Sequence, residues 1–251
     1  MSLNIHLFPC LSDNYGFLVN DTETGRTACV DTPDAEAILN ELHGLGWTLE
    51  LILNTHWHPD HAGGNAVLKE KTGAQIVAPQ EVERVGSVDR RVGHGDIVEL
   101  GATAFQVIDV GGHTLGHIAY YAPGADVLFA GDALFPMGCG RLFEGTPQQM
   151  WASLQRIAAL PERTTVYSAH EYTLANARFA VSVDADPAVA ARAEAVARAR
   201  ASSEATVPTT VAAERATNPF LRAPLLPIAA AAPDAATAFG IVRAAKDQFR
   251  G

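Results

Sequence analysis

A cluster of histidines and aspartates near residue 60 constrains this chain more than any other feature. Residues 55–61 have the sequence THWHPDH and directly follow an apolar run. Alternate residues of an extended chain point to the same side, so His56 and His58 are able to grip one metal ion. Asp60 and His61 fall at the next turn, within reach of a second ion. A polar surface loop is the plain alternative, but three imidazoles and one carboxylate within six residues favour a metal site.

Three more candidate ligands follow other apolar runs. His113, Asp132 and His170 each come a few residues after a run that is typical of a β-strand. Loops at strand ends aim side chains while the sheet stays rigid, so such positions commonly carry sites. A single histidine at one of them is more often structural. Seven donors that all follow strands are hard to explain as packing, and we interpret them as one metal centre.

Short apolar runs alternate with turns and a few helical stretches through the first two thirds of the chain. Thr146, Pro147 and Gln149 form a capping-box pattern that predicts a helix over residues 147–159. Many short strands with intervening helices suit sheets packed face to face and covered by helices. We predict strands at 5–8, 16–19, 27–30, 49–53, 75–77, 105–110, 118–121, 127–130 and 165–167, and further helices at 35–45 and 64–71.

The composition changes after His170. From there to the end the sequence is rich in alanine and arginine, with little β-branched character. Asp186 precedes a helical run to about residue 202, and Asp234 precedes another that ends at 249. We therefore predict a catalytic domain over residues 1–170 and a helical domain over residues 171–251.

Charge and composition exclude several classes of protein. The net charge of −10 argues against a large nucleic-acid or anionic-membrane surface, because basic patches hold such partners. The apolar stretch 223–239 is interrupted by prolines, which predicts that it does not span a membrane. The three cysteines are widely spaced, and the first six residues do not resemble a signal peptide. We expect a cytoplasmic protein, a monomer, with no nucleic acid or membrane as partner.

The donor set resembles that of the metallo-β-lactamase superfold. This resemblance implies an α/β fold, a four-layer αββα sandwich, to which this chain adds a C-terminal helical appendage. It also implies two divalent cations per chain, with Zn²⁺ expected and Fe or Mn²⁺ as alternatives. The resemblance also implies that Asp31 and His117 orient the ligands without binding the metals themselves. By the resemblance His56, His58 and His113 bind the first metal, Asp60, His61 and His170 bind the second, and Asp132 bridges both together with a water or hydroxide.

A narrower resemblance is to the glyoxalase II (hydroxyacylglutathione hydrolase) family. The segments that carry it span nearly the whole chain: LSDNY at 11–15, GDALF at 131–135, GCGRLFEG at 138–145, AHEYT at 169–173, NPFLR at 218–222 and KDQF at 246–249. It implies hydrolysis of S-D-lactoylglutathione to D-lactate and glutathione, in methylglyoxal detoxification. Asp60 and Asp132 are the implied catalytic residues. The implied substrate-binding residues are Arg141, Phe143, Tyr172 and Arg222, and the implied partner is a small glutathione thioester.

Two departures from the family pattern concern substrate binding. Phe143 stands where some relatives have a second ligand-contacting tyrosine, so one hydroxyl is absent. Some relatives carry another basic residue soon after position 222, whereas residues 223–225 here are Ala-Pro-Leu. An activated water and a good thiolate leaving group need no separate acid, which suits thioester cleavage.

Other functions of the superfold remain as alternatives. The nearest is a glutathione persulfide dioxygenase with one iron, which shares the metal loop and a Gly-Cys-Gly-Arg segment. The segment around His170 and the long helical region argue against it. A β-lactamase is usually exported, and a nuclease is disfavoured by the acidic charge. A metal-binding scaffold without activity would be expected to have lost a ligand, and none is missing.

Overall fold

The computed structural model describes residues 3–251, so the first two residues of the segment examined for a signal peptide lie outside it. The chain divides into two compact units. The described part of the first comprises residues 3–109 and 116–131, and the second comprises residues 110–115 and 132–251. The predicted domain boundary between residues 170 and 171 stays a prediction. Within residues 3–251 no helix is long and apolar enough to cross a membrane.

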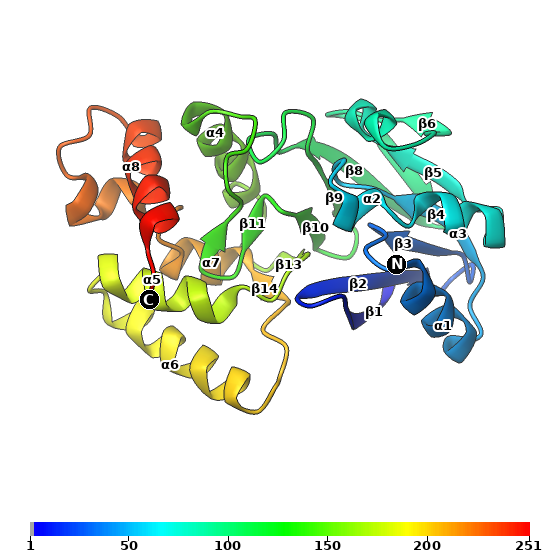
Figure 1. Cartoon of the computed structure of the whole chain (residues 1–251), viewed down its shortest axis with the longest axis horizontal. Coiled ribbons are helices and arrows are strands. Elements are labelled where there is room, and N and C mark those ends of the chain that lie inside the picture. The colour runs from blue at the N-terminus through cyan, green and yellow to red at the C-terminus, as the bar shows by residue number, and fades with distance from the viewer. Residues whose placement is uncertain (1–2) are drawn as a thin grey trace. The chain divides into compact units, whose positions relative to one another are not determined.

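The first unit is built on two sheets (Figure 1). One is a mixed sheet. Its first, second and third strands pair antiparallel, and its third to sixth strands pair parallel. In spatial order it comprises β1 (Leu3–Cys10), β2 (Asn14–Asp21), β3 (Thr27–Val30), β4 (Leu49–Leu53), β5 (Gln75–Ala78) and β6 (Arg90–Arg91). The other is antiparallel, in the order β10 (Val127–Gly131), β9 (Ile118–Ala122), β8 (Thr103–Asp109) and β7 (Ile97–Leu100).

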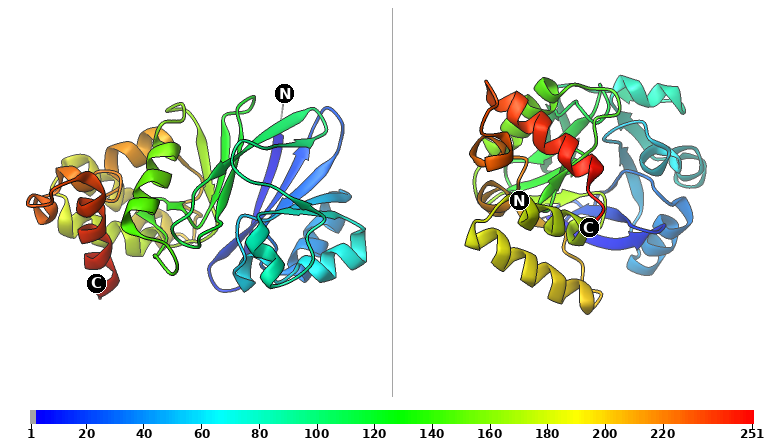
Figure 2. Two further views of the ribbon diagram at one scale, coloured as in Figure 1. Left: turned by 90° about the horizontal axis from the view of Figure 1, so that it is seen from above. Right: turned by 60° about the vertical axis from the view of Figure 1, so that its left-hand side comes forward.

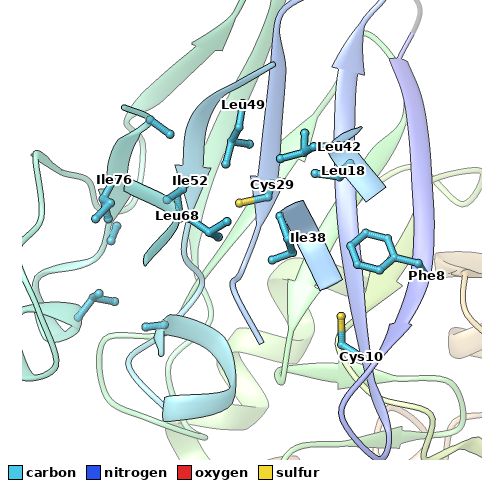
Figure 3. Packing of buried hydrophobic residues seen from close by; sticks show 14 residues of the cluster. Phe8, Cys10, Leu18, Cys29, Ile38, Leu42, Leu49, Ile52, Leu68 and Ile76 are labelled. Atoms are coloured by element: carbon cyan, nitrogen blue, oxygen red, sulfur yellow. The ribbon is translucent and has the colours of Figure 1, made fainter. Parts of the chain in front are cut away.

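Helices cover one face of the mixed sheet. They are α1 (Ala35–Leu45), α2 (Pro59–Ala62) and α3 (Asn65–Thr72), and a 3-10 turn follows at η1 (Gln80–Arg84). Ile38 and Leu42 of α1 pack with Leu18, Cys29 and Ile52 of the strands (Figure 3). The opposite face meets the antiparallel sheet, where the rings of Phe17 and Phe129 lie 5.7 Å apart. Every residue of β2 is buried, as expected for a strand that is covered on both faces.

The second unit is mainly helical. Its helices are α4 (Pro147–Ala158), α5 (Thr173–Val183), α6 (Pro187–Ala201), α7 (Val211–Thr217) and α8 (Ala235–Gln248), with 3-10 turns η2 (Ala223–Leu225) and η3 (Pro227–Ala229). Helices α5 and α6 lie side by side, and α8 packs against α4 (Figures 1 and 2). The unit also has two short antiparallel pairs: β11 (Leu134–Phe135) with β12 (Gly138–Cys139), and β13 (Thr165–Ser168) with β14 (Thr209–Thr210).

All the predicted strands exist, and the predicted helices are confirmed to within about two residues at most ends. Thr146 and Gln149 form the expected capping box at the start of α4. Asp186 and Asp234 cap α6 and α8 as expected. Helices α5 and α7 were not predicted, nor were the short strands β6, β7, β11, β12 and β14. Most of these strands have two residues, too few for a periodic pattern.

Candidate metal centre

The first unit holds four of the seven predicted ligands on the segment that follows β4. The chain leaves the strand extended and then turns into α2, which carries Asp60 and His61. His56 Nε2 lies 3.0 Å from His58 Nδ1, as alternation along an extended chain predicts. His61 Nε2 lies 3.5 Å from Asp60 Oδ2. The short helix α2, which starts at Pro59, was not predicted, yet it brings the second pair of donors together.

Asp31 fixes the orientation of two of these rings. Its carboxylate accepts hydrogen bonds from the Thr55 backbone N–H (2.7 Å) and from Thr55 Oγ1 (2.8 Å). The same carboxylate accepts the Nδ1–H of His61 at 2.8 Å. Thr55 Oγ1 has donated its hydrogen to Asp31, so at 3.0 Å it accepts the Nδ1–H of His56. Both rings therefore bond to the protein through Nδ1, which leaves Nε2 as the ring nitrogen on the opposite side, where an imidazole can bind a metal.

The backbone supports this arrangement. Asp31 follows β3 with φ = 58°, a left-handed conformation that is uncommon for a residue with a side chain. His117, the other predicted supporting residue, is buried and stacks on His56 with ring centroids 4.5 Å apart. An added Cβ at Gly131, which ends β10, would lie 2.6 Å from Thr55 Oγ1 and 2.8 Å from His117 Cε1. Only glycine leaves room for these two side chains.

Asn14 is a residue of this set that the sequence did not reveal. Its Nδ2 donates to Asp60 Oδ2 at 3.2 Å and so orients a carboxylate whose side chain is 38% exposed. Asn14 belongs to the LSDNY segment, in which we had assigned no residue a role. The only sequence signal for Asn14 is that it belongs to this segment, because residues 14 and 60 are far apart in the sequence.

The second unit holds the other three predicted ligands. Asp132 Oδ2 lies 3.4 Å from His113 Nε2, and Asp132 Oδ1 lies 3.3 Å from His170 Nε2. His113 donates its Nδ1–H to the carbonyl oxygen of Arg141 at 2.8 Å, and its other ring nitrogen, Nε2, faces Asp132. All three side chains are buried. A buried carboxylate between two imidazole nitrogens has the chemistry of a metal ligand.

Three of the four predicted substrate-binding residues lie beside this second set. Tyr172 stacks on His170, with ring centroids 4.6 Å apart and planes at 2°. Phe143 lies edge-on to His113 at 5.2 Å, and Arg141 provides the carbonyl that holds the same ring. The side chains of Phe143 and Arg141 are largely exposed. This placement is compatible with contact to a bound substrate.

Arg222 has a different environment. Its Nε donates to Asp184 Oδ2 at 2.7 Å and its Nη2 donates to Asp186 Oδ2 at 2.9 Å, and the side chain is only 16% exposed. These two carboxylates raise the pKa of the guanidinium, with the hydrogen bond to Asp184 as the largest cause. The role of Arg222 in substrate binding stays a prediction. Its ion pairs with Asp184 and Asp186 connect the start of α6 to the segment that follows α7.

None of the three cysteines of this chain is suited to act as a nucleophile. Burial raises the pKa of the Cys139 thiol to about 11 and that of Cys10 to about 12. Burial also raises the pKa of Cys29. All three thiols are therefore protonated at neutral pH, and a protonated thiol is a poor nucleophile.

Comparisons with known proteins identify a superfamily and a narrower family for this chain. Residues 27–170 match the metallo-beta-lactamase superfamily, and residues 171–249 match the hydroxyacylglutathione hydrolase C-terminus. The hydroxyacylglutathione hydrolase of Erythrobacter litoralis is 55% identical over 251 residues, covering 98% of this chain and 100% of that protein. The chain belongs to the hydroxyacylglutathione hydrolase family. The resemblance to glyoxalase II is thereby confirmed.

Further comparisons support the family and the fold. The hydroxyacylglutathione hydrolase of Hyphomonas neptunium is 51% identical over 254 residues, covering 98% of each chain. A metallo-beta-lactamase of known structure from Staphylococcus aureus is 21% identical and aligns with a TM-score of 0.71, over 100% of this chain and 68% of that one. The α/β metallo-β-lactamase fold expected from the sequence is confirmed. The match of residues 171–249 to a hydroxyacylglutathione hydrolase segment favours this family over the dioxygenase alternative.

Proposed function

We propose that this chain is a two-metal thioesterase that hydrolyses S-D-lactoylglutathione, and S-2-hydroxyacylglutathiones in general, to a 2-hydroxy acid and glutathione. In a cell this reaction belongs to methylglyoxal detoxification. The observation that carries the proposal is the orientation of the imidazoles: Nδ1 of His56, His61 and His113 each lies within hydrogen-bonding distance of a protein oxygen, so Nε2 is the ring nitrogen on the opposite side. Such rings are prepared for a cation, and membership of the family indicates the substrate class.

We assign the ligands as two groups that share one carboxylate. Distances within each unit support the assignment: the nitrogens of His56 and His58 converge, His61 faces Asp60, and Asp132 faces two rings. Nitrogen and carboxylate donors suit Zn²⁺, with Fe and Mn²⁺ as alternatives. We propose His56, His58 and His113 for one cation, Asp60, His61 and His170 for the other, and Asp132 for both.

When bound, two divalent cations would lower the pKa of a shared water towards ~7 and polarise the thioester carbonyl. Asp60, held by Asn14, would orient that water through its exposed carboxylate and accept its proton. Asp132 would keep the rings of His113 and His170 at a fixed spacing. The leaving thiol has a pKa of roughly 8.5, so it departs as a thiolate without a proton donor.

The cations around Arg141 support the choice of an anionic thiol carrier. Burial, followed by the charges of Arg243 and Arg141, lowers the pKa of Lys246 from 10.5 to about 8. The exposed Arg141 thus belongs to a group of cations on an acidic chain, with Asp247 as the nearby carboxylate at 3.9 Å. We propose that Arg141 and Arg222 bind the carboxylates of glutathione, while Tyr172 and Phe143 contact its remaining parts.

The decisive experiment combines an assay with elemental analysis. Purified protein should hydrolyse S-D-lactoylglutathione and contain about two divalent cations per chain. A protein that holds a single iron and consumes oxygen in the presence of glutathione persulfide would instead be a dioxygenase. Light scattering on the same preparation tests the proposed monomer. The free, buried cysteines support our proposal of a cytoplasmic location, and we propose residues 171–251 as a helical domain after a catalytic domain.

Arg141→Ala should raise KM for S-D-lactoylglutathione and leave kcat nearly unchanged. The side chain would hold a part of the substrate that does not react, and uniform binding of that kind appears in KM. Losing one charge-assisted hydrogen bond costs about 1.5–3 kcal/mol, or about ten- to a hundredfold. The measurement is steady-state kinetics on S-D-lactoylglutathione and on a small thioester that lacks the peptide carboxylates.

The small thioester is the control for that prediction. Its KM should not change in Arg141→Ala, because it offers no carboxylate to the guanidinium. Arg222→Ala allows the same comparison for a side chain that already pairs with Asp184 and Asp186. Equal losses on both substrates would show that the arginine in question supports the fold and does not bind glutathione.

A further inference from the structure

A pair of buried asparagines lies next to the segment of the first unit that carries four predicted ligands. Asn54 directly follows β4, and Asn65 is the first residue of α3. Asn54 is fully buried and Asn65 is 5% exposed. Asn65 Nδ2 donates to Asn54 Oδ1 at 2.7 Å, and Asn54 Nδ2 donates to Asn65 Oδ1 at 3.1 Å. A buried amide needs partners for its polar groups, so this reciprocal pairing fixes both side chains.

The same pair reaches the backbone of His61. Asn54 Nδ2 donates its second hydrogen to the carbonyl oxygen of His61 at 2.9 Å. The backbone N–H of Thr32 donates to the same oxygen at 2.8 Å. The hydroxyl of Thr32 donates to Asn65 Oδ1 at 2.8 Å, which closes the network. The carbonyl of His61 is therefore held from two different segments of the chain.

Helix α2 needs such support from outside. It has only four residues, and a helix of that length is not stable by itself. The last carbonyl groups of a helix also lack partners within the helix, and the carbonyl of His61 is one of these. Asn54 and Thr32 supply the donors that it needs. Because α2 carries both Asp60 and His61, the position of these two predicted ligands depends on how this carbonyl is held.

Asn54 is itself fixed to the sheet. Its backbone N–H donates to the carbonyl of Val77 on β5 at 3.0 Å, and its own carbonyl accepts the hydroxyl of the buried Tyr120 at 3.0 Å. The backbone of Asn54 leads within two residues to His56, while its side chain holds His61. One residue thus connects the rigid end of the sheet to both pairs of predicted ligands on this segment.

We propose that Asn54 is a positioning residue for His61, acting through the backbone carbonyl of His61, and that Asn65 keeps the amide of Asn54 in place. Asp31 accepts the Nδ1–H of the imidazole, and Asn54 fixes the backbone of the same residue. Together these bonds set where Nε2 of His61 lies relative to Asp60. The inference rests on the proposed function in one respect, namely that His61 is a metal ligand.

The test is Asn54→Leu in the full-length protein, studied with Co²⁺ as the probe metal. Leucine keeps the size and branching of the side chain but cannot donate to His61 O. Changing a residue that orients a metal ligand typically costs about ten- to a hundredfold in metal affinity or activity, and the smaller loss is expected for a contact to the backbone. We therefore expect about tenfold weaker Co²⁺ binding in competition with a chelator, and about tenfold lower kcat. The visible absorption of bound Co²⁺ should change with the ligand geometry, whereas KM should stay within about twofold.

Asn20→Leu is the matched control. Asn20 is an 8% exposed residue of β2, and its Nδ2 donates to Thr27 Oγ1 at 2.9 Å and to Gly25 O at 3.0 Å. These bonds hold the turn between β2 and β3. Both leucine variants lose buried hydrogen bonds, so both should lower Tm by about 2–12 °C. Only Asn54→Leu should change the Co²⁺ spectrum, the Co²⁺ affinity and kcat.

A double variant separates positioning from stability. Asn54→Leu leaves the amide of Asn65 without its partner, whereas Asn54→Leu combined with Asn65→Leu replaces the whole pair by apolar groups, which can be nearly neutral. The Tm of the double variant should therefore recover towards the wild-type value, and this variant serves if Asn54→Leu does not fold. Its Co²⁺ affinity should recover by no more than about threefold, because the donor that is released, Thr32 Oγ1, lies 3.3 Å from His61 O.

Failure of this inference is distinguishable from failure of the proposed function. If Asn54→Leu and the double variant keep the wild-type Co²⁺ spectrum and affinity, or if both quantities recover together with Tm, Asn54 is a structural residue and the inference is wrong. If the wild-type protein binds Co²⁺ but hydrolyses no glutathione thioester, the proposed function is wrong, and the spectrum still tests the inference. A wild-type protein that binds no Co²⁺ contradicts both.

Discussion

Asp132→Asn should lower kcat for thioester hydrolysis by about a thousandfold or more. The change keeps the shape of the side chain but removes the charge that faces His113 Nε2 at 3.4 Å and His170 Nε2 at 3.3 Å. A metal centre supplies several kcal/mol of charge stabilisation, and each 1.36 kcal/mol corresponds to about tenfold in rate. Without the shared carboxylate, elemental analysis should find about one cation per chain or fewer. Single-turnover kinetics and metal content measured on one preparation check both expectations.

The control for this prediction is Glu194→Gln, which removes one negative charge from an exposed position on α6. It should behave as wild type in rate and in metal content. Circular dichroism on Asp132→Asn should show a folded protein, because the substitution is nearly isosteric. Two retained cations together with a normal kcat would show that Asp132 is not the shared ligand.

Glu214→Ala should lower the free energy of unfolding by about 3–5 kcal/mol, the range for breaking a buried ion pair. Glu214 is fully buried and accepts hydrogen bonds from the Met137 backbone N–H, from Asn218 Nδ2, from Thr209 Oγ1 and from Arg192 Nη2. Removing the carboxylate leaves the guanidinium of Arg192 in the interior without its counter-charge. For a chain of this size each kcal/mol lowers Tm by about 2–4 °C, so Tm should fall by about 6–20 °C. Urea and thermal unfolding measure the two quantities.

Glu162→Ala provides the comparison for that prediction. Glu162 is an exposed residue that pairs with Arg215 at 3.1 Å, and exposed pairs are typically worth less than about 1 kcal/mol. Its Tm should stay close to that of the wild type. A similarly small change in Glu214→Ala would show that water replaces the carboxylate and that the buried network contributes little to stability.

The sequence alone determined the longer strands, most of the longer helices and the candidate donors of the site. Alternation of apolar residues predicted the longer strands, and the caps at Asp186 and Asp234 predicted the starts of two helices. These signals are local, because a cap or a strand pattern is complete within a few residues. The donor cluster at 55–61 is equally local. The sequence therefore indicated both the fold and a metal centre before any contact was known.

Only the tertiary structure decided which side chains orient the donors. Met137 contacts Glu214 across 77 residues of sequence, and Asp60 contacts Asn14 across 46. Nothing in the sequence near Glu214 or Asn14 shows what they hold, and the two-residue strands β11 and β12 are too short to have a pattern. Arg222 illustrates the same limit, since its partners Asp184 and Asp186 lie on a different segment. Hydrogen bonds of a single side chain depend on where the folded backbone brings the partner, and local periodicity carries no information about that position.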